Sequence, residues 1–370
     1  MTAGLYIHIP FCKKKCPYCD FYSISYSNSL AKEYTNILSE EVKKINTKID
    51  SIYIGGGTPT VLPVNLLEKL LKSLKDMLKT SGENTIEVNP ESIDKDKLIL
   101  LRRYNINRIS IGMQSLYDNK LKFLGRIHSA KEAKKAVFNA RKYGFSNISI
   151  DLIYGIPDES LSSWKEELKQ AVELPVQHVS CYSLICEPHT KFYKLNNVID
   201  DNITAKMYLF NMKFLPKNGF LHYEVSNFSL RGFECGHNIK YWEGSDYIGI
   251  GPSAVSFINR KRIKNVPDVK EYMKRYSSHE TTAAHIDKLS PSKYAKELAA
   301  LKIRTTEGIN FKWFKEKTGF SFFDIENRTD INTFKSMGLL GIQKRKGVDI
   351  GIYLSTKGFL FCDEVSSRFV

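Results

Sequence analysis

Short apolar runs and longer amphipathic stretches alternate through the first two-thirds of the chain. Short runs bounded by turn residues are typical of strands, and apolar positions spaced by three or four residues are typical of helices. The runs that predict strands are Leu5–Ile9, Ser51–Ile54, Thr85–Val88, Arg108–Ile111, Ile148–Leu152 and His178–Leu184. The stretches that predict helices are roughly Ser29–Ile45, Pro63–Lys79, Lys95–Tyr104, Ala130–Tyr143, Leu161–Val172 and Ile203–Asn218.

This alternation predicts an α/β fold in which parallel strands are joined by right-handed helical crossovers. Six such units form an open, partial (β/α)6 barrel, which we expect over residues 1–230. Barrels of this kind carry their functional residues at the C-terminal ends of the strands. Candidate site residues are therefore sought directly after each predicted strand.

The pattern changes near Asn265, where strand–helix alternation stops. The later elements are helices near Asp268–Tyr276, Ser292–Leu301 and Phe311–Lys317, a strand–turn–strand over Ile342–Leu354, and an amphipathic helix over Lys357–Phe369. We expect residues 265–370 to form a smaller α+β, winged-helix-like domain, with residues 231–264 as a connecting segment.

The amino-acid composition limits which class of protein this chain can be. The chain has 370 residues, of which 42% are hydrophobic and 26% charged, as in ordinary globular proteins. The start of the chain predicts neither a signal peptide nor a transmembrane helix, and we expect a cytoplasmic protein. The net charge of +15 suggests an anionic partner, but most lysines are dispersed on helix faces. Only the stretch 260–264 is compactly basic, and an exposed turn or strand edge explains it equally well.

Three of the seven cysteines lie close together near the start of the chain, at Cys12, Cys16 and Cys19. An odd cysteine count in a long chain argues against disulfides. The spacing favours one metal centre. Three thiolates can hold a [4Fe–4S] cluster and leave one iron open for a ligand, whereas zinc requires a fourth ligand, for which His8 is the candidate.

The C-x3-C-x2-C spacing, with Tyr18 before the last cysteine, resembles the cluster loop of the radical S-adenosylmethionine (SAM) superfamily. The resemblance implies that Cys12, Cys16 and Cys19 hold a [4Fe–4S] cluster whose open iron chelates the amino and carboxylate groups of SAM. In that superfamily an electron from the cluster splits the sulfonium into methionine and a 5′-deoxyadenosyl radical. The cofactors then carry the chemistry, and the protein must place them and exclude water.

Two segments resemble the parts of the superfamily that meet SAM. Glycines after the second predicted strand let a ligand approach the backbone closely, although a plain turn has the same sequence. The positions that the resemblance assigns to SAM there are Gly56, Gly57 and Thr58, together with Tyr6 on the first strand and Tyr18 in the cysteine loop. Ile185, after the sixth predicted strand, belongs to the same set.

Four polar residues complete the expected SAM site: Glu87, Gln114 and Asp151 near the ends of predicted strands, and Arg126 between the fourth and fifth strands. Glu87 offers a carboxylate for the SAM ammonium, and Arg126 offers a fixed cation for the SAM carboxylate. Gln114 can donate and accept hydrogen bonds around the SAM ribose. Asp151 stands at a position where acidic residues of nucleotide-binding α/β proteins bind a ribose diol. The role of each residue is ambiguous when it is taken alone. A glutamate at the barrel rim that pairs with a lysine, for example, would have the same sequence context as Glu87.

The order and the sequences of these segments resemble those of the coproporphyrinogen III oxidase-like branch of the superfamily over nearly the whole chain. That branch contains oxygen-independent oxidases and haem chaperones. The oxidases carry a fourth cysteine two residues after the third, where this chain has Phe21 as the chaperones do. The oxidases also have a long N-terminal extension, and here eleven residues precede Cys12. These features favour a haem chaperone that transfers haem to an acceptor protein.

A second motif bears on haem. The sequence His237-Asn238-Ile239-Lys240-Tyr241-Trp242 resembles the His-Asn-x-x-Tyr-Trp motif that the chaperones use for haem. A neutral imidazole can ligate iron, while Tyr241 and Trp242 offer flat apolar area for a macrocycle. Cys235 is a further possible contact. The alternative is structural, with His237 and Asn238 at a helix start and the aromatics packed in an interface.

Two other functions stay open at this point. The first is oxidative decarboxylation of the propionates of coproporphyrinogen III by a radical SAM mechanism, which Phe21 disfavours. The second is RNA modification, which the net charge and the winged-helix-like tail suggest but no RNA-binding module supports. The sequence does not say whether SAM is cleaved, and it names neither the haem acceptor nor the electron donor.

Overall fold

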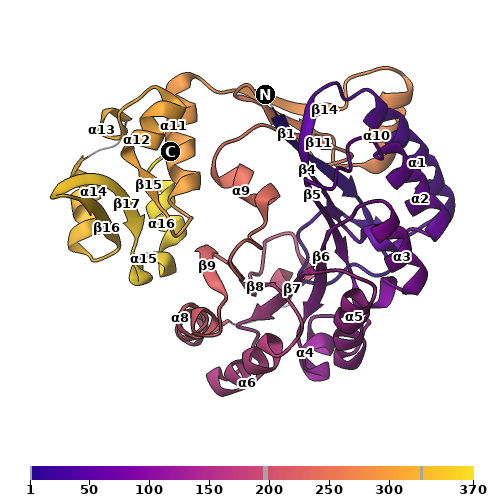
Figure 1. The fold of residues 1–370 in the computed structure, drawn as a ribbon, viewed down its shortest axis with the longest axis horizontal. Coiled ribbons are helices and arrows are strands. Elements are labelled where there is room, and N and C mark those ends of the chain that lie inside the picture. Colours follow the sequence, from indigo (N-terminus) through magenta and orange to yellow (C-terminus); the bar gives the residue numbers. More distant parts are fainter. Residues whose placement is uncertain (1, 195–198, 326–327) are drawn as a thin grey trace.

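The computed structural model describes residues 2–194, 199–325 and 328–370. Six neighbouring parallel strands form the arc at its centre (Figure 1). They are, in spatial order, β1 (Thr2–Ile9), β4 (Lys48–Gly56), β5 (Glu83–Val88), β6 (Arg108–Gln114), β7 (Asn147–Tyr154) and β8 (His178–Ser183). This order equals the chain order of the six predicted strands, which confirms the expected α/β partial barrel.

Helices cover the convex side of this arc (Figure 1). They are α1 (Asn28–Lys43), α2 (Val64–Ser73), α3 (Lys95–Arg103), α4 (Asp118–Phe123), α5 (Ala130–Lys142), α6 (Leu161–Val172) and α8 (Asp201–Lys217). Several begin where the sequence supplies an N-cap oxygen: Asp94, Ser129, Ser160 and Asp200 each accept a backbone N–H of the first turn. These caps explain why the predicted starts of α3, α5 and α6 agree with the structure.

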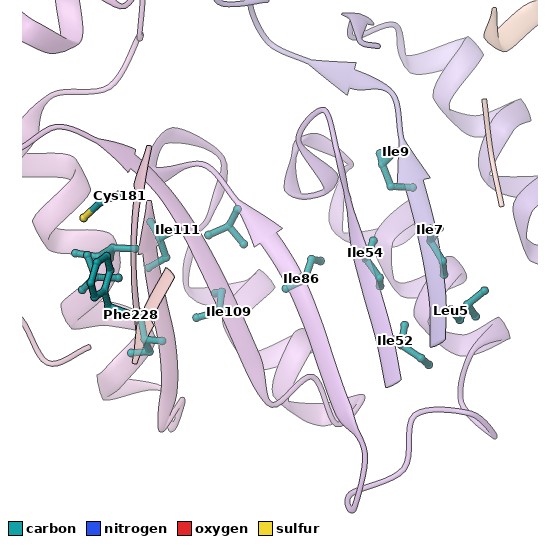
Figure 2. Packing of buried hydrophobic residues seen from close by; sticks show 14 of the residues in the cluster. Leu5, Ile7, Ile9, Ile52, Ile54, Ile86, Ile109, Ile111, Cys181 and Phe228 are labelled. Atoms are coloured by element: carbon teal, nitrogen blue, oxygen red, sulfur yellow. The ribbon is translucent and has the colours of Figure 1, made fainter. Parts of the chain in front are cut away.

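Each central strand has an apolar outer face and a polar inner face, as the two-residue period of a strand requires. On the outer face, Ile52, Ile54, Ile86, Ile109 and Ile111 are fully buried, and Figure 2 shows them on successive strands. The alternate residues point into the barrel and line its cavity. These inner residues include Glu87, Arg108, Ser110, Asp151, His178 and Ser180.

The sheet continues beyond the six predicted strands on both sides. On one side β11 (Tyr247–Ile250) pairs in parallel with β1, followed by the antiparallel strands β12 (Val255–Ile258), β13 (Lys261–Asn265) and β14 (Ala283–Lys288). On the other side β10 (Asn227–Ser229) and β9 (Leu221–Glu224) follow β8. These strands are short and lie outside the six strand–helix units from which the central strands were predicted.

The compactly basic stretch belongs to this extension. Arg260 lies in a turn with positive φ, and β13 is an internal strand in which Arg262 forms an ion pair with Glu297. Because β14 pairs with β13, the sheet passes residue 265, where the sequence placed the start of the C-terminal domain. We propose that this domain begins with α11 instead.

The C-terminal part combines helices with a small antiparallel sheet of order β15-β17-β16. Its elements are α11 (Pro291–Lys302), β15 (Ile309–Asn310), α12 (Phe311–Thr318), α13 (Phe322–Ile325), α14 (Arg328–Ser336), β16 (Leu340–Arg345), β17 (Val348–Leu354), α15 (Thr356–Leu360) and α16 (Cys362–Ser367). The last predicted helix is two helices, because the backbone of Phe361 leaves the helical region at φ −115° and ψ 26°.

Short elements complete the fold. They are β2 (Phe11–Cys12), β3 (Ile24–Ser25), the 3-10 turns η1 (Pro59–Val61) and η2 (Pro90–Ser92), α7 (Lys191–Lys194), α9 (Gly236–Trp242) and α10 (Val269–Ser277). In Figure 1, α9 lies inside the arc of strands, between β1 and β9. Within the described ranges, every helix is too short or too polar to cross a lipid bilayer.

Candidate functional site

The three clustered cysteines lie on one loop at the C-terminal end of β1. Cys12 ends β2, which pairs with β3, and the N–H of Tyr26 donates to the Cys12 carbonyl at 2.9 Å. Between these strands the N–H of Cys19 closes a turn onto the Cys16 carbonyl at 3.2 Å. All three thiols are free and line a single cavity of about 430 Å³. The loop therefore holds them at the mouth of the barrel.

The glycine segment after β4 fastens this loop. The N–H groups of Gly57 and Thr58 donate to the carbonyls of Ile9 and Phe11, each at 2.8 Å. A Cβ atom on Gly57 would lie 2.8 Å from the Phe11 oxygen, so only glycine permits this approach. Gly56, Gly57 and Thr58 also line the cavity. The segment thus has a packing role that the sequence did not indicate, in addition to facing a ligand.

Hydrogen bonds connect two of the cysteines across the cavity. Arg126 places Nη1 3.4 Å from the Cys16 sulfur, and its Nη2 donates to Asn89 Oδ1 at 2.6 Å. Asn89 Nδ2 in turn donates to the Thr58 hydroxyl at 2.8 Å, and that hydroxyl lies 3.6 Å from the Cys12 sulfur. Asn89 was missed by the sequence reasoning, although it directly follows a predicted strand.

Glu87 lies inside the barrel and is held by two donors. Its Oε1 accepts from the Tyr53 hydroxyl at 2.8 Å, and its Oε2 accepts from the Gly56 N–H at 3.0 Å. Burial raises the pKa of Glu87 to about 7, and the two hydrogen bonds oppose this rise. No lysine pairs with Glu87 in the described chain, so the surface-glutamate alternative does not apply. A buried carboxylate of this kind favours a cationic ligand.

Asp151 and Gln114 also line the cavity, but at different depths. Strand β7 continues to Tyr154, so Asp151 lies within the strand rather than at its end, which corrects its predicted place. It accepts from the Ser110 hydroxyl at 3.4 Å, and burial raises its pKa. Gln114 ends β6 with φ of 65°, a conformation uncommon for residues other than glycine.

Tyr18 and Ile185 are at the cavity mouth, as expected for residues that cover a bound ligand. Ile185 is 61% exposed and Phe21 is 68% exposed. Tyr6 is not among the described residues that line the cavity, so its contact with SAM stays a prediction. Its hydroxyl instead contacts His8 Nδ1 at 3.1 Å.

His8 does not serve the zinc alternative. Its Nε2 donates to the Tyr22 carbonyl at 2.9 Å while Nδ1 contacts Tyr6, and burial lowers its pKa to about 4. Nowhere in the described ranges do three or more His, Cys, Asp or Glu side chains converge closely enough for one metal ion. A cluster differs from a single ion because each thiolate binds a separate iron.

The predicted haem motif forms α9, and the structure favours the packing alternative for His237. The imidazole is 1% exposed, with Nδ1 3.0 Å from the Ser51 hydroxyl and Nε2 2.9 Å from the Tyr241 hydroxyl. Gly4 leaves room for it, since a Cβ there would lie 3.0 Å from the ring. Both nitrogens are engaged in this conformation, so iron ligation by His237 stays a prediction that requires these contacts to open.

Most of the other residues in and beside the motif also pack against the protein. Tyr241 packs edge-on against Tyr247 at 4.6 Å between ring centroids, and Arg304 lies over the Trp242 ring at 5.7 Å. Cys235 is buried, with its sulfur 3.5 Å from Glu83. Among these residues Asn238 lines the cavity. The motif therefore contributes an amide to the cavity, and its aromatic residues pack against the protein.

The cysteine loop has the ligand chemistry of an iron–sulfur site. Burial raises the pKa of Cys12 and raises that of Cys19 to about 11, so both are protonated at neutral pH without a metal. Soft thiolates are the preferred ligands of such clusters, and the Arg126 guanidinium beside Cys16 offsets their negative charge.

Comparisons with known proteins agree with this geometry. Residues 6–171 match the radical SAM superfamily. The haem chaperone HemW of Lactococcus lactis is 34% identical, over 99% of this chain and 96% of its own length. HemW of Bacillus subtilis is 33% identical, over 99% and 98% of the two chains, and HemW of Escherichia coli is 38% identical, over 68% and 69%.

Among solved structures, the coproporphyrinogen III oxidase HemN of Escherichia coli, a radical SAM enzyme, is similar over 100% of this chain and 89% of its own. The TM-score is 0.86 at 22% sequence identity. At this identity the likeness establishes the fold, and it does not transfer the oxidase activity.

Proposed function

Because the chain belongs to the HemW family of radical SAM proteins, we propose that it is a haem chaperone, which binds haem and passes it to an acceptor protein. The observation that carries this proposal is the identity of about one-third along the full length of two HemW proteins. Phe21 supports it, because an exposed phenylalanine stands where the oxidases of the branch carry a fourth cysteine. We also propose that the protein is cytoplasmic, where its thiols stay reduced.

As a radical SAM protein, the chain binds a [4Fe–4S] cluster and SAM, and we assign the cluster to Cys12, Cys16 and Cys19. When bound, this pair supplies a strong reductant next to a reducible sulfonium. The cavity residues proposed to hold SAM are Tyr18, Gly56, Gly57, Thr58, Glu87, Gln114, Arg126, Asp151 and Ile185. Tyr6 stays a predicted member of this site, although its hydroxyl contacts His8 here.

The residues divide the work of binding SAM. Glu87 is held by Tyr53 and Gly56 with its carboxylate in the cavity, where it suits the SAM amino group. The guanidinium of Arg126 is fixed by Asn89 and by the Gly112 carbonyl, and it suits the SAM carboxylate. Asp151 lies deeper, as a partner for the ribose hydroxyls. The apolar mouth at Ile185 limits the access of water.

Haem titration tests the proposal. The anaerobically reconstituted protein, with cluster and SAM bound, is titrated with haem while the Soret band is recorded. We expect a saturable shift, followed by loss of the bound spectrum when apomyoglobin is added as a haem acceptor. Parallel incubation with coproporphyrinogen III, SAM and a reductant should give no protoporphyrinogen. Appreciable protoporphyrinogen without a haem-dependent shift would assign the oxidase reaction instead.

A further inference from the structure

Arg108 is a buried cation without a partner. It lies at the start of β6, only 2% of its surface is exposed, and it lines the cavity. Its Nε has no hydrogen-bond acceptor, and within the described ranges Arg108 forms no ion pair. A buried donor without an acceptor is costly to keep. The fold therefore holds at this position a guanidinium with an unused hydrogen-bond donor.

The acidic groups nearest to Arg108 are committed elsewhere. Glu83 accepts from the N–H groups of Gly236 and His237 and so caps α9. Asp151 accepts from Ser110, and Glu87 accepts from Tyr53 and Gly56. These carboxylates reduce the cost of burying Arg108 at a distance, but none comes within ion-pair range in the described chain.

The neutral neighbours do not neutralise it either. His178 contacts the Ser149 hydroxyl at 2.8 Å through Nδ1 and the Tyr223 hydroxyl at 2.8 Å through Nε2. Burial, with a smaller effect of Arg108, lowers the pKa of His178, so this imidazole is uncharged. Two amides, Asn227 and Asn238, line the same cavity and offer further donors.

This site adjoins the one assigned to SAM but lies deeper in the barrel. Arg108, Ser110 and Gly112 alternate along the inner face of β6, and the Gly112 carbonyl accepts from Arg126 at 3.2 Å. Four residues of strand separate Arg108 from Gly112, or about 13 Å. Arg108 therefore lies at the cavity floor, and Arg126 lies near the cysteines.

The ligand at the floor should be a single carboxylate. A guanidinium binds a carboxylate through two parallel hydrogen bonds, and Arg108 is the one cation at this depth among the described cavity residues, since Lys14 and Lys15 are in the cysteine loop. A phosphate dianion would require more positive charge. We propose that Arg108 binds a propionate of a tetrapyrrole that enters the cavity, with Asn238 as a further donor in the cavity lining; this rests on the proposed haem-binding function.

The test compares acids with their esters. The wild-type protein is titrated with haem and with haem dimethyl ester, and with coproporphyrin III and its tetramethyl ester, in the same detergent buffer. We expect each free acid to bind roughly 10- to 100-fold more tightly than its ester, as for hydrogen bonds to charged groups. In Arg108→Met this preference should disappear, and Arg108→Lys should keep part of it. Arg103→Met, which removes an exposed arginine on the outer surface, should behave as the wild type.

The outcomes separate this inference from the proposed function. Absence of haem binding together with an acid-over-ester preference for coproporphyrin, lost in Arg108→Met, would reject the chaperone and keep the propionate site. Equal binding of acid and ester by the wild type, an unchanged preference in Arg108→Met, or binding of neither porphyrin would overturn the assignment of Arg108. The comparison of acid and ester binding by the wild type tests the assignment even if Arg108→Met fails to fold.

Discussion

The Nη1 atom of Arg126 lies 3.4 Å from the sulfur of Cys16, although 109 residues separate them in the chain. This contact joins the cluster loop to the strand ends on the far side of the barrel. The same guanidinium is oriented by Asn89 at 2.6 Å, so its position does not depend on a ligand. The charge that suits the SAM carboxylate is therefore in place before SAM arrives.

Replacing Arg126 should weaken SAM binding more than it weakens the cluster. In Arg126→Met we expect the dissociation constant for SAM to rise roughly 10- to 100-fold, because a charge-assisted pair is lost. Arg126→Lys keeps the charge but not the fork that contacts both Cys16 and Asn89, and should be intermediate. Anaerobic calorimetry measures the affinity, and iron content reports the cluster. Unchanged SAM affinity in Arg126→Met would exclude the assigned role.

Removal of any one of the three loop cysteines should abolish both iron binding and SAM binding. Cys12→Ala, Cys16→Ala and Cys19→Ala are expected to lack the brown colour of the reconstituted protein, since a thiolate ligand is missing. Cys181→Ala is the control: Cys181 is 1% exposed on the outer face of the sheet among apolar residues (Figure 2). It should keep iron, sulfide and SAM affinity with a small loss of stability. Full iron content in a loop variant would contradict the assignment.

Gly57 should be intolerant of any side chain. A Cβ there would meet the Phe11 and Ile9 carbonyl oxygens at 2.8 and 2.9 Å, and backbone oxygens cannot turn aside as a flexible side chain can. Gly57→Ala should therefore displace the cysteine loop and lower cluster incorporation, measured as iron per chain after reconstitution. Gly236→Ala is the matched control, because its Cβ would lie 3.6 Å from the nearest atom. Equal iron in both variants would refute the argument.

The sequence predicted the parts of the fold that repeat a strong local pattern. All six parallel strands have apolar outer faces, and three of the covering helices begin at predicted positions where Asp94, Ser129 and Ser160 act as caps. Strands β9 to β14 were missed because they are short and lie outside the six strand–helix units. Strand β13 (Lys261–Asn265) is an example: its basic sequence has no strand pattern, and it lies between its neighbours β12 and β14.

Prediction of the site from the sequence is limited in the same way, because it also relies on local patterns. Residues at strand ends that line the cavity, such as Glu87 and Gln114, could be singled out because the barrel rule points to them. Arg108 was overlooked because it begins a strand, and only the two-residue alternation with Ser110 and Gly112 places it inside. His237 was assigned from a motif, and no local pattern could show that Ser51 and Tyr241 occupy both ring nitrogens.

SAM affinity should depend on pH through Glu87. Burial raises the pKa of this carboxyl to about 7, so near neutral pH part of the protein is protonated and cannot pair with an amino group. A cationic ligand favours the ionised form, and binding then releases a proton. Affinity is therefore expected to fall as the pH drops below about 7.

The comparison with Glu87→Gln isolates this effect from the titration of SAM itself. The variant should bind SAM more weakly at pH 8, and its affinity should depend less on pH than that of the wild type. Calorimetry between pH 6 and 8 gives both curves. Parallel curves would show that Glu87 does not contact the ligand.

His237→Ala distinguishes packing from iron ligation. The imidazole contacts Ser51 and Tyr241 and lies 5.3 Å from the Tyr53 ring, so its loss should cost about 3 kcal/mol of unfolding free energy. Burial lowers its pKa to about 3, so the folded state excludes a proton that the unfolded chain binds below about pH 6.5. Wild-type stability should fall with acid over this range, and the variant should lose that part of the dependence. His189→Ala, at an exposed side chain, is the stability control.

Haem spectra complete the test of His237. If His237 only packs, the Soret position of bound haem is unchanged in His237→Ala. A shifted band with unaltered stability would show that His237 is a haem ligand.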